Sequence, residues 1–100
     1  MSKLLVISGD NVGSNMGGVG VRNWELAYAL SNHNDVTLAV PESTDIKSER
    51  VNILPFKLEG GDLRSVAQKS DVIILHGFVL HFHPYLAELN IPIAVDLYVP

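Results

Sequence analysis

Two short apolar runs constrain the fold of this chain more than any other feature of its sequence. KLLVIS at residues 3–8 is followed by a glycine, and DVIIL at residues 71–75 is followed by a histidine and a glycine. Neither run alternates between apolar and polar residues in its interior, which is typical of strands that are buried on both faces. We therefore expect a central parallel sheet with helices on both of its faces.

Extended and helical patterns alternate along the whole chain. Leu26, Ala27 and Leu30 recur at helical spacing, and Asp62 and Pro84 are residue types that favour helix starts. The segment Asn32–Asn34 is expected to end the first helix, because asparagine tolerates the left-handed conformation. The expected strands are 3–8, 35–40, 51–56, 71–75 and 91–97, and the expected helices are 19–32, 63–69 and 80–89, with a polar loop at 42–50.

The predicted fold class is α/β: a Rossmann-like, three-layer parallel sheet of about five strands. Right-handed crossovers give such a sheet the strand order 3-2-1-4-5. With 100 residues, 47% of them hydrophobic, the chain is long enough for one domain spanning residues 1–100. Because the chain ends directly after the fifth strand, we expect a truncated domain whose exposed sheet edge offers a surface for self-association.

Composition excludes several classes of function. The net charge is −4 and Lys and Arg are scattered, so nucleic acid is not an expected partner. The chain has no cysteine, which excludes disulfides and cysteine zinc sites. It also shows no signal peptide and no run of roughly 20 apolar residues, so a cytoplasmic location is expected.

The topology of the expected sheet by itself predicts where a ligand site would lie. In open parallel sheets, ligands bind outside the carboxyl ends of the strands, where the strand order reverses. In the order 3-2-1-4-5 the first and fourth strands are neighbours, so the loop at 9–19 should face the loop at 76–83. The end of the fifth strand, at 96–100, should lie alongside them.

A glycine-rich loop follows the first strand. Glycine lets a backbone approach a ligand closely, and the start of the next helix presents amide groups to an anion such as phosphate. The spacing matches neither the dinucleotide fingerprint G-x-G-x-x-G nor a Walker loop. A purely structural turn is therefore an open alternative. The glycines of this region are Gly9, Gly13, Gly17, Gly18 and Gly20.

Four side chains near this edge are candidate ligand contacts, each with a structural alternative. Arg22 can bind an anion or be an exposed helix arginine. His76 can donate a hydrogen bond to a hydroxyl or phosphate, or bond the backbone at a strand end. Asp96 and Tyr98 can hold ligand hydroxyls at the end of the fifth strand, whereas Asp96 can also be a solvated or capping carboxylate.

Two further groups are interpreted structurally. His76, His81 and His83 lack a carboxylate or cysteine at ligand spacing, so no metal site is expected. Trp24 and Tyr28 are four residues apart on the first helix, which favours packing over a sugar-stacking platform.

Three segments resemble family 4 glycosyltransferases of the GT-B fold. MGGVGVRNWELAYALSNHNDVTLAVP resembles their N-terminal glycine loop, first helix and second strand, DVIILHGF their fourth strand and loop, and IPIAVDLYVP their fifth strand. The resemblance implies transfer of a sugar from a nucleotide-sugar donor to a hydroxyl acceptor with retention at the anomeric carbon, without metal or another cofactor. The chain corresponds to the acceptor-side domain, which is expected to be inactive without the second, nucleotide-binding domain.

The resemblance also assigns roles to residues. It matches Gly17 and Gly18 to the loop near the donor phosphates and His76 to a histidine that lines the cleft. Asp96 and Tyr98 stand where many members of the family have a histidine. His76 and Asp96 are thus the catalytic candidates, and the substrate-binding candidates are Gly17, Gly18, Arg22 and Tyr98.

Two other functions stay open at this point. A non-catalytic module could bind a nucleotide or phosphate, with Glu42 after the second strand holding a ribose. An interaction domain could use apolar surface near the fifth strand and Trp24 to contact a partner.

Overall fold

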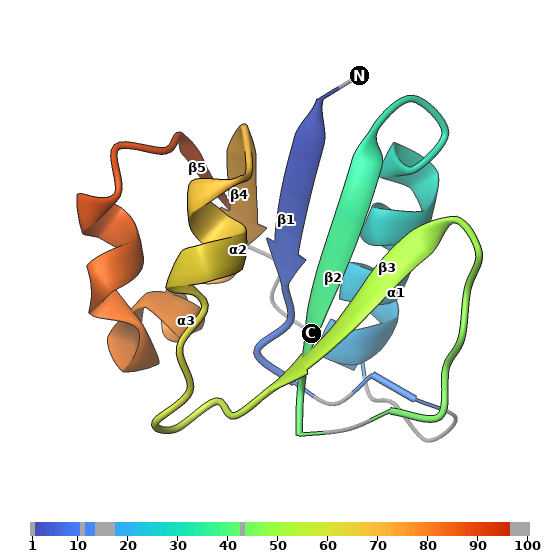
Figure 1. The fold of residues 1–100 in the computed structure, drawn as a ribbon. Helices are drawn as coiled ribbons and strands as arrows, with labels where there is room; N and C mark the ends of the chain where they lie inside the picture. Colours follow the sequence, from blue (N-terminus) through green and yellow to red (C-terminus); the bar gives the residue numbers. More distant parts are fainter. Residues whose placement is uncertain (1, 11, 14–17, 43, 97–100) are drawn as a thin grey trace.

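The computed structural model describes residues 2–10, 12–13, 18–42 and 44–96, which form one α/β unit (Figure 1). Strands and helices alternate along it as the sequence predicts, except that the described residues between the second and third strands, 42 and 44–50, contain no helix. In chain order the elements are β1 (Lys3–Ile7), α1 (Gly18–Leu30), β2 (Asp35–Pro41), β3 (Val51–Phe56), α2 (Arg64–Gln68), β4 (Val72–Leu75), α3 (Gly77–Phe82), the 3₁₀ helix η1 (Pro84–Glu88) and β5 (Ile93–Val95).

The five strands form one sheet in the order β3-β2-β1-β4-β5, and every pair in it is parallel. This confirms both the fold class and the strand order expected from the sequence. β1 is the central strand, with Leu5 in register with Thr37 of β2 and with Ile73 of β4. The carboxyl ends of β1 and β4 therefore lie next to each other at one edge of the sheet.

Helices cover both faces of the sheet and create two apolar cores. α1 lies on one face, and α2 and α3 lie on the other (Figure 1). Successive residues of β1 point to opposite faces, so Leu4 and Val6 pack in the α1 core while Leu5 and Ile7 pack in the other core. All four are buried, which explains why the strand is apolar from Leu4 to Ile7, whereas Lys3 at its start is exposed.

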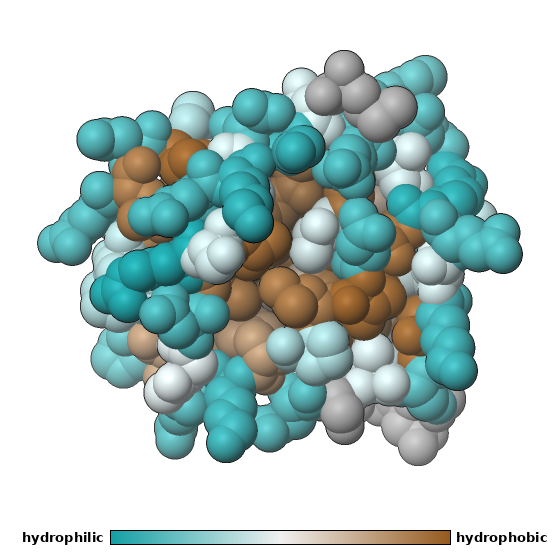
Figure 2. All heavy atoms as spheres, in the orientation of Figure 1, coloured by the Kyte–Doolittle hydropathy of each residue, from teal (hydrophilic) through white to brown (hydrophobic). Residues whose placement is uncertain are grey.

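The face that carries α2 is only partly covered. α2 has five residues, and the β2–β3 connection contributes no helix among its described residues. Figure 2 shows apolar residues at the centre of this face, surrounded by hydrophilic ones. Leu54, Leu58 and Val66 are partly buried apolar residues that pack against this core. No helix in the part of the chain that the structure describes is long and apolar enough to cross a membrane.

The prediction of a single helix at 80–89 is wrong. The chain instead forms α3 up to Phe82 and then η1 from Pro84, with His83 between them at φ −130° and ψ 61°. Proline has no N–H and disfavours helical geometry in the residue before it, so the α-helix ends there. Pro84 does occupy a helix start, as the sequence suggests, but the start is that of a 3₁₀ turn.

Helix caps also differ in detail from those expected. The backbone N–H of Arg64 donates to Asp62 Oδ1 at 2.9 Å, although Leu63 is the N-cap residue, and this hydrogen bond lowers the pKa of the Asp62 carboxyl. The left-handed stop expected at 32–34 does not form. Instead, Asn34 Nδ2 donates to the carbonyl of Leu30 at 3.0 Å.

β5 is shorter than the predicted strand at 91–97. It spans Ile93–Val95, because Pro92 has no N–H to donate, although its carbonyl still accepts a hydrogen bond from the N–H of Ile73. Leu97 lies outside the described residues.

Candidate functional site

The carboxyl ends of β1 and β4 mark the point in the sheet where the strand order reverses. β1 leads to α1 on one face, and β4 leads to α3 on the other. A Cβ added to Gly9 would lie 3.1 Å from Phe78 Cδ1 and 3.2 Å from Val79 Cγ2. Gly9, the first residue of the expected loop 9–19, thus packs directly on the start of α3, and residues 77–82 of the second expected loop form this helix.

Replacing Gly9 with alanine is expected to lower the free energy of unfolding by about 1 kcal/mol, because the added methyl group overpacks this contact. Phe78 is exposed and can move aside, whereas Val79 is buried in the core and cannot move as easily. Urea denaturation checks the value. Gly60→Ala is not a suitable control, since Gly60 has a φ of +79°; Ser65→Ala on the exposed surface of α2 is suitable. An equal stability of the Gly9 and Ser65 variants would contradict the tight contact.

A small buried polar cluster fixes the start of the loop after β1. Asn23 Nδ2 of α1 donates to Ser8 Oγ at 3.1 Å, and Ser8 Oγ donates to the carbonyl of Asp10 at 2.6 Å. Ser8 is fully buried and Asn23 nearly so. These two residues hold the loop to α1. Neither was expected from the sequence to belong to the site, although Asn23 stands four residues before the buried Ala27, a spacing that indicates an inward-facing position.

Arg22 and Asp96 form a two-point ion pair across this edge. Arg22 Nε lies 3.2 Å from Asp96 Oδ2, and Arg22 Nη2 lies 3.3 Å from Asp96 Oδ1. The Arg22 side chain is 48% exposed and that of Asp96 is 15% exposed. Arg22 lies on α1, and Asp96 directly follows β5. Both candidates are therefore at the predicted edge, and they contact each other.

His76 caps α3. The backbone N–H of Phe78 donates to His76 Nδ1 at 3.2 Å, so the structural alternative of a backbone contact is present. In a neutral ring whose Nδ1 accepts, the proton is on Nε2, which leaves that nitrogen as a donor. The N–H of Asp96 donates to the carbonyl of Leu75, so the strand ends that carry His76 and Asp96 lie side by side.

The other substrate-binding candidates are Gly17, Gly18 and Tyr98. Gly17 and Tyr98 lie outside the described residues, and Gly18 is the exposed first residue of α1.

The two aromatic residues of α1 differ in their surroundings. Trp24 packs against the α1 core, whereas Tyr28 is 42% exposed and stacks under Arg50, whose Cζ is 4.2 Å from the ring centroid. The packing prediction is thus correct for Trp24 and wrong for Tyr28.

The histidines near α3 do not gather into a metal site. His81 is exposed, while His83 is buried and hydrogen-bonds Tyr85 and the carbonyl of Leu58. Within the described ranges, no three His, Asp or Glu side chains lie close enough together to hold a metal ion.

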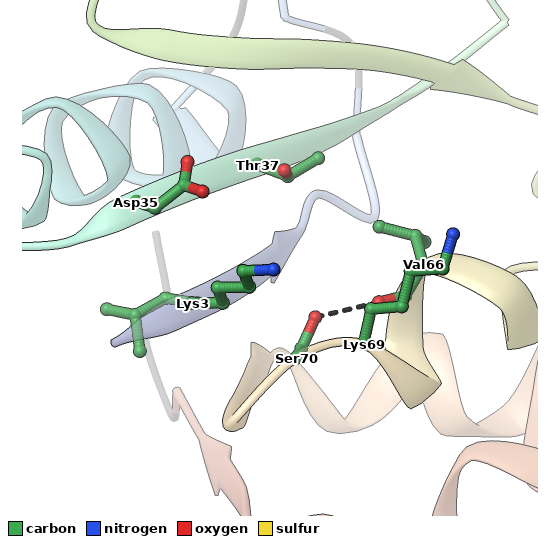
Figure 3. Close-up of a pocket in the computed structure, with 7 residues that line it drawn as sticks. Lys3, Asp35, Thr37, Val66, Lys69 and Ser70 are labelled. Carbon is green, nitrogen blue, oxygen red and sulfur yellow. Dashed lines mark hydrogen bonds between the residues drawn. The ribbon is translucent and has the colours of Figure 1, made fainter. Parts of the chain in front are cut away.

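A separate open hollow of about 170 Å³ lies at the opposite, amino edge of the sheet (Figure 3). It lies between the starts of β1 and β2 and the end of α2, where Ser70 Oγ donates to the carbonyl of Val66 at 2.8 Å. Parallel sheets of this kind bind ligands at the carboxyl edge, so this hollow is not our candidate site. Its lining residues are Lys3, Leu4, Asp35, Thr37, Val66, Lys69 and Ser70.

The candidate site therefore consists of Arg22, His76 and Asp96 at the carboxyl edge, with Gly9, Ser8 and Asn23 shaping the adjoining loop. It offers a carboxylate acceptor, a guanidinium donor and an imidazole donor from three different parts of the fold. Comparison of the chain with models of known protein families, with curated proteins and with solved structures finds no match.

Proposed function

We propose that this chain is the N-terminal, acceptor-side domain of a retaining glycosyltransferase of the GT-B type, which moves a sugar from a nucleotide-sugar donor to a hydroxyl acceptor. The observation that carries the proposal is the grouping of Arg22, Asp96 and His76 at the carboxyl edge beside the β1–β4 switch point. These residues are far apart in the sequence. Their meeting at the edge where such sheets bind ligands supports a binding role.

The chemistry of the group suits a hydroxyl acceptor. A hydroxyl both donates and accepts hydrogen bonds, so it can donate to Asp96 while it accepts from Arg22 or from His76 Nε2. In this proposal Asp96 and His76 orient the acceptor hydroxyl for attack on the donor sugar. The resemblance of residues 16–41, 71–78 and 91–100 to family 4 glycosyltransferases is the second support, and it names the reaction class.

The alternative of a non-catalytic nucleotide- or phosphate-binding module has weaker support. Its sequence basis is an incomplete glycine fingerprint. In addition, the guanidinium of Arg22, the candidate anion contact, is already bound by the carboxylate of Asp96.

The test is a nucleoside-diphosphate release assay on the product of the complete open reading frame that contains these residues, with a panel of nucleotide sugars and hydroxyl acceptors. Asp96→Asn is expected to lower kcat/KM roughly 10- to 100-fold, because the acceptor hydroxyl then donates to a neutral amide oxygen instead of a charged carboxylate oxygen. His76→Gln is expected to act in the same direction.

The chain provides a matched control for this experiment. Arg64 and Asp62 form an exposed ion pair at 3.1 Å at the start of α2, on the face of the sheet opposite to α1, which carries Arg22. Asp62→Asn should leave kcat/KM unchanged. Absence of nucleoside-diphosphate release with every donor, or equal activity of the Asp96 and Asp62 variants, would overturn the proposal.

A further inference from the structure

Exposed apolar side chains gather beside His76 at the carboxyl edge. Among the described residues, the exposed large apolar side chains are Tyr28, Phe78 and Val95. Phe78 follows Gly77 in α3 and is 47% exposed, and Val95 at the end of β5 is 46% exposed. A Cβ added to Gly77 would lie 3.9 Å from Val95 Cγ1, so Val95 lies over the start of α3. Two of the three exposed side chains are therefore next to the same glycine.

Val95 is on the face of the sheet that carries α3. Successive residues of a strand point to opposite faces, so Val95 and Ile93 share a face. Ile93 packs against the core that contains Val79 of α3. Phe78 and Val95 thus belong to one side of the sheet, at its carboxyl edge.

The Phe78 ring has neighbours on the protein that favour one position. The Phe82 ring meets it edge-on, with 5.1 Å between the ring centroids and 72° between the ring planes. A Cβ added to Gly9 would lie 3.1 Å from Phe78 Cδ1, so the ring also lies against the backbone after β1. Such contacts reduce the conformational freedom that the ring would lose when a ligand packs on it.

A hydrogen-bonding group adjoins this apolar surface. His76 Nδ1 accepts from the backbone N–H of Phe78 at 3.2 Å, so the imidazole lies against the residue that carries the exposed ring. In the neutral ring, Nε2 then carries the proton and can donate to a ligand hydroxyl. Ligand sites in proteins typically combine aromatic and apolar surface with a few polar groups that orient the ligand. The start of α3 presents both.

We propose that Phe78 and Val95 bind an aryl or alkyl group of the acceptor, beside the hydroxyl that His76 orients. This inference rests on the proposed function and names the acceptor class: a hydroxyl compound that carries an apolar group, rather than a wholly polar sugar. Contact between that group and the Phe78 ring removes apolar surface of both from water. Phe78 is thereby a specificity-determining residue, because it contacts a part of the acceptor that does not react.

The experiment titrates the 100-residue chain with phenyl β-D-glucopyranoside and, separately, with methyl β-D-glucopyranoside, and follows the backbone amide signals of Gly77 and Val95 by NMR. The two probes share the sugar and differ only in the apolar group on the anomeric oxygen. The unmodified chain is expected to bind the phenyl glucoside more tightly, on the order of tenfold. Phe78→Ala is expected to reduce this preference to about twofold or less.

Three further variants make the result specific. Tyr28→Ala removes an aromatic ring of similar exposure, 42%, from α1 and should leave the preference unchanged. His76→Gln should weaken the binding of both glucosides and leave their ratio unchanged, because both probes carry the sugar hydroxyls. Phe78→Leu keeps an apolar side chain at this position and should retain part of the preference, which separates loss of the flat ring from loss of the fold.

Equal affinities for the two glucosides in the unmodified chain, a preference that survives Phe78→Ala, or no response to either probe would each overturn the inference. A dimer that Phe78→Ala dissociates would also overturn it, because a second copy of the chain would then occupy the surface. The nucleoside-diphosphate release assay, run with both glucosides as acceptors, is a separate test. Release without a preference for the phenyl glucoside would sink the inference alone, whereas a binding preference without any release would sink only the glycosyltransferase proposal.

Discussion

Replacing Leu5 with alanine is expected to lower the free energy of unfolding by about 3 kcal/mol, a typical loss for a leucine truncated in a well-packed core. Leu5 is fully buried on the central strand β1 and packs in the core on the α2 face of the sheet. Truncation removes apolar area from the core and leaves a cavity. The strands on either side, β2 and β4, are held in register and cannot collapse into it.

Leu54→Ala is the matched control for this measurement. Leu54 lies on the edge strand β3 and is only partly buried against the same core. Its truncation is expected to cost less than half as much, since solvent already reaches the site and the edge strand can relax. Urea denaturation of both variants measures the difference, and equal losses would contradict the central position of β1 in the core.

Replacing Tyr85 with phenylalanine is expected to lower the free energy of unfolding by about 2 kcal/mol. Its hydroxyl accepts the N–H of Leu63 at 2.7 Å and lies 2.9 Å from His83 Nδ1. His83 Nε2 contacts the carbonyl of Leu58 at 2.8 Å, and since a carbonyl only accepts, the neutral ring donates from Nε2 and accepts at Nδ1. The phenol therefore donates to Nδ1 and completes a chain of three hydrogen bonds.

The cost arises because the variant leaves His83 Nδ1 without a donor in a buried position. His83 is 1% exposed, so water cannot replace the phenol. The ring contact between Arg64 and residue 85 is retained in phenylalanine, which isolates the effect of the hydroxyl. Tyr28→Phe is the matched control, because Tyr28 is 42% exposed. Similar losses for the two variants would contradict a buried network.

Comparing the unmodified chain with Tyr85→Phe at alkaline pH gives a second measurement of the role of the hydroxyl. Burial raises the pKa of Tyr85 above its ordinary value of 10.0. The unfolded chain therefore ionises before the folded one, and the contribution of Tyr85 is complete below pH 10 and is lost as the pH rises through the raised pKa. The stability gap between the unmodified chain and Tyr85→Phe is expected to narrow over this range. A gap that stays constant would show that the phenol ionises equally in both states.

Most of the architecture was predictable because it depends on local apolar patterns. The continuous runs at 3–8 and 71–75 indicate strands buried on both faces, and strands separated by helices indicate parallel crossovers of fixed handedness. The order β3-β2-β1-β4-β5 is one of the orders that agree with these two observations, and it is the one expected. The same rule located the candidate site at the carboxyl edge of β1 and β4.

Element ends were less predictable, because they depend on single hydrogen bonds. The break at His83 and Pro84 replaces one predicted helix with α3 and η1, since an α-helix cannot continue through the residue before a proline without strain. The stop after α1 uses the Asn34 side chain rather than a left-handed residue. Both outcomes are compatible with the same sequence pattern, so the pattern alone does not choose between them.

The sequence by itself determined that β1 and β4 are central strands whose carboxyl ends meet at one edge of the sheet, because the apolar runs that form them are local patterns. Only the tertiary structure decided which side chains pair across separate elements at this edge: Arg22 with Asp96, and Ser8 with Asn23. The physical reason is that a side-chain hydrogen bond or ion pair forms only when its two polar atoms are placed to within about an ångström. That placement results from the packing of α1, α3 and η1 on the sheet, which no single segment encodes.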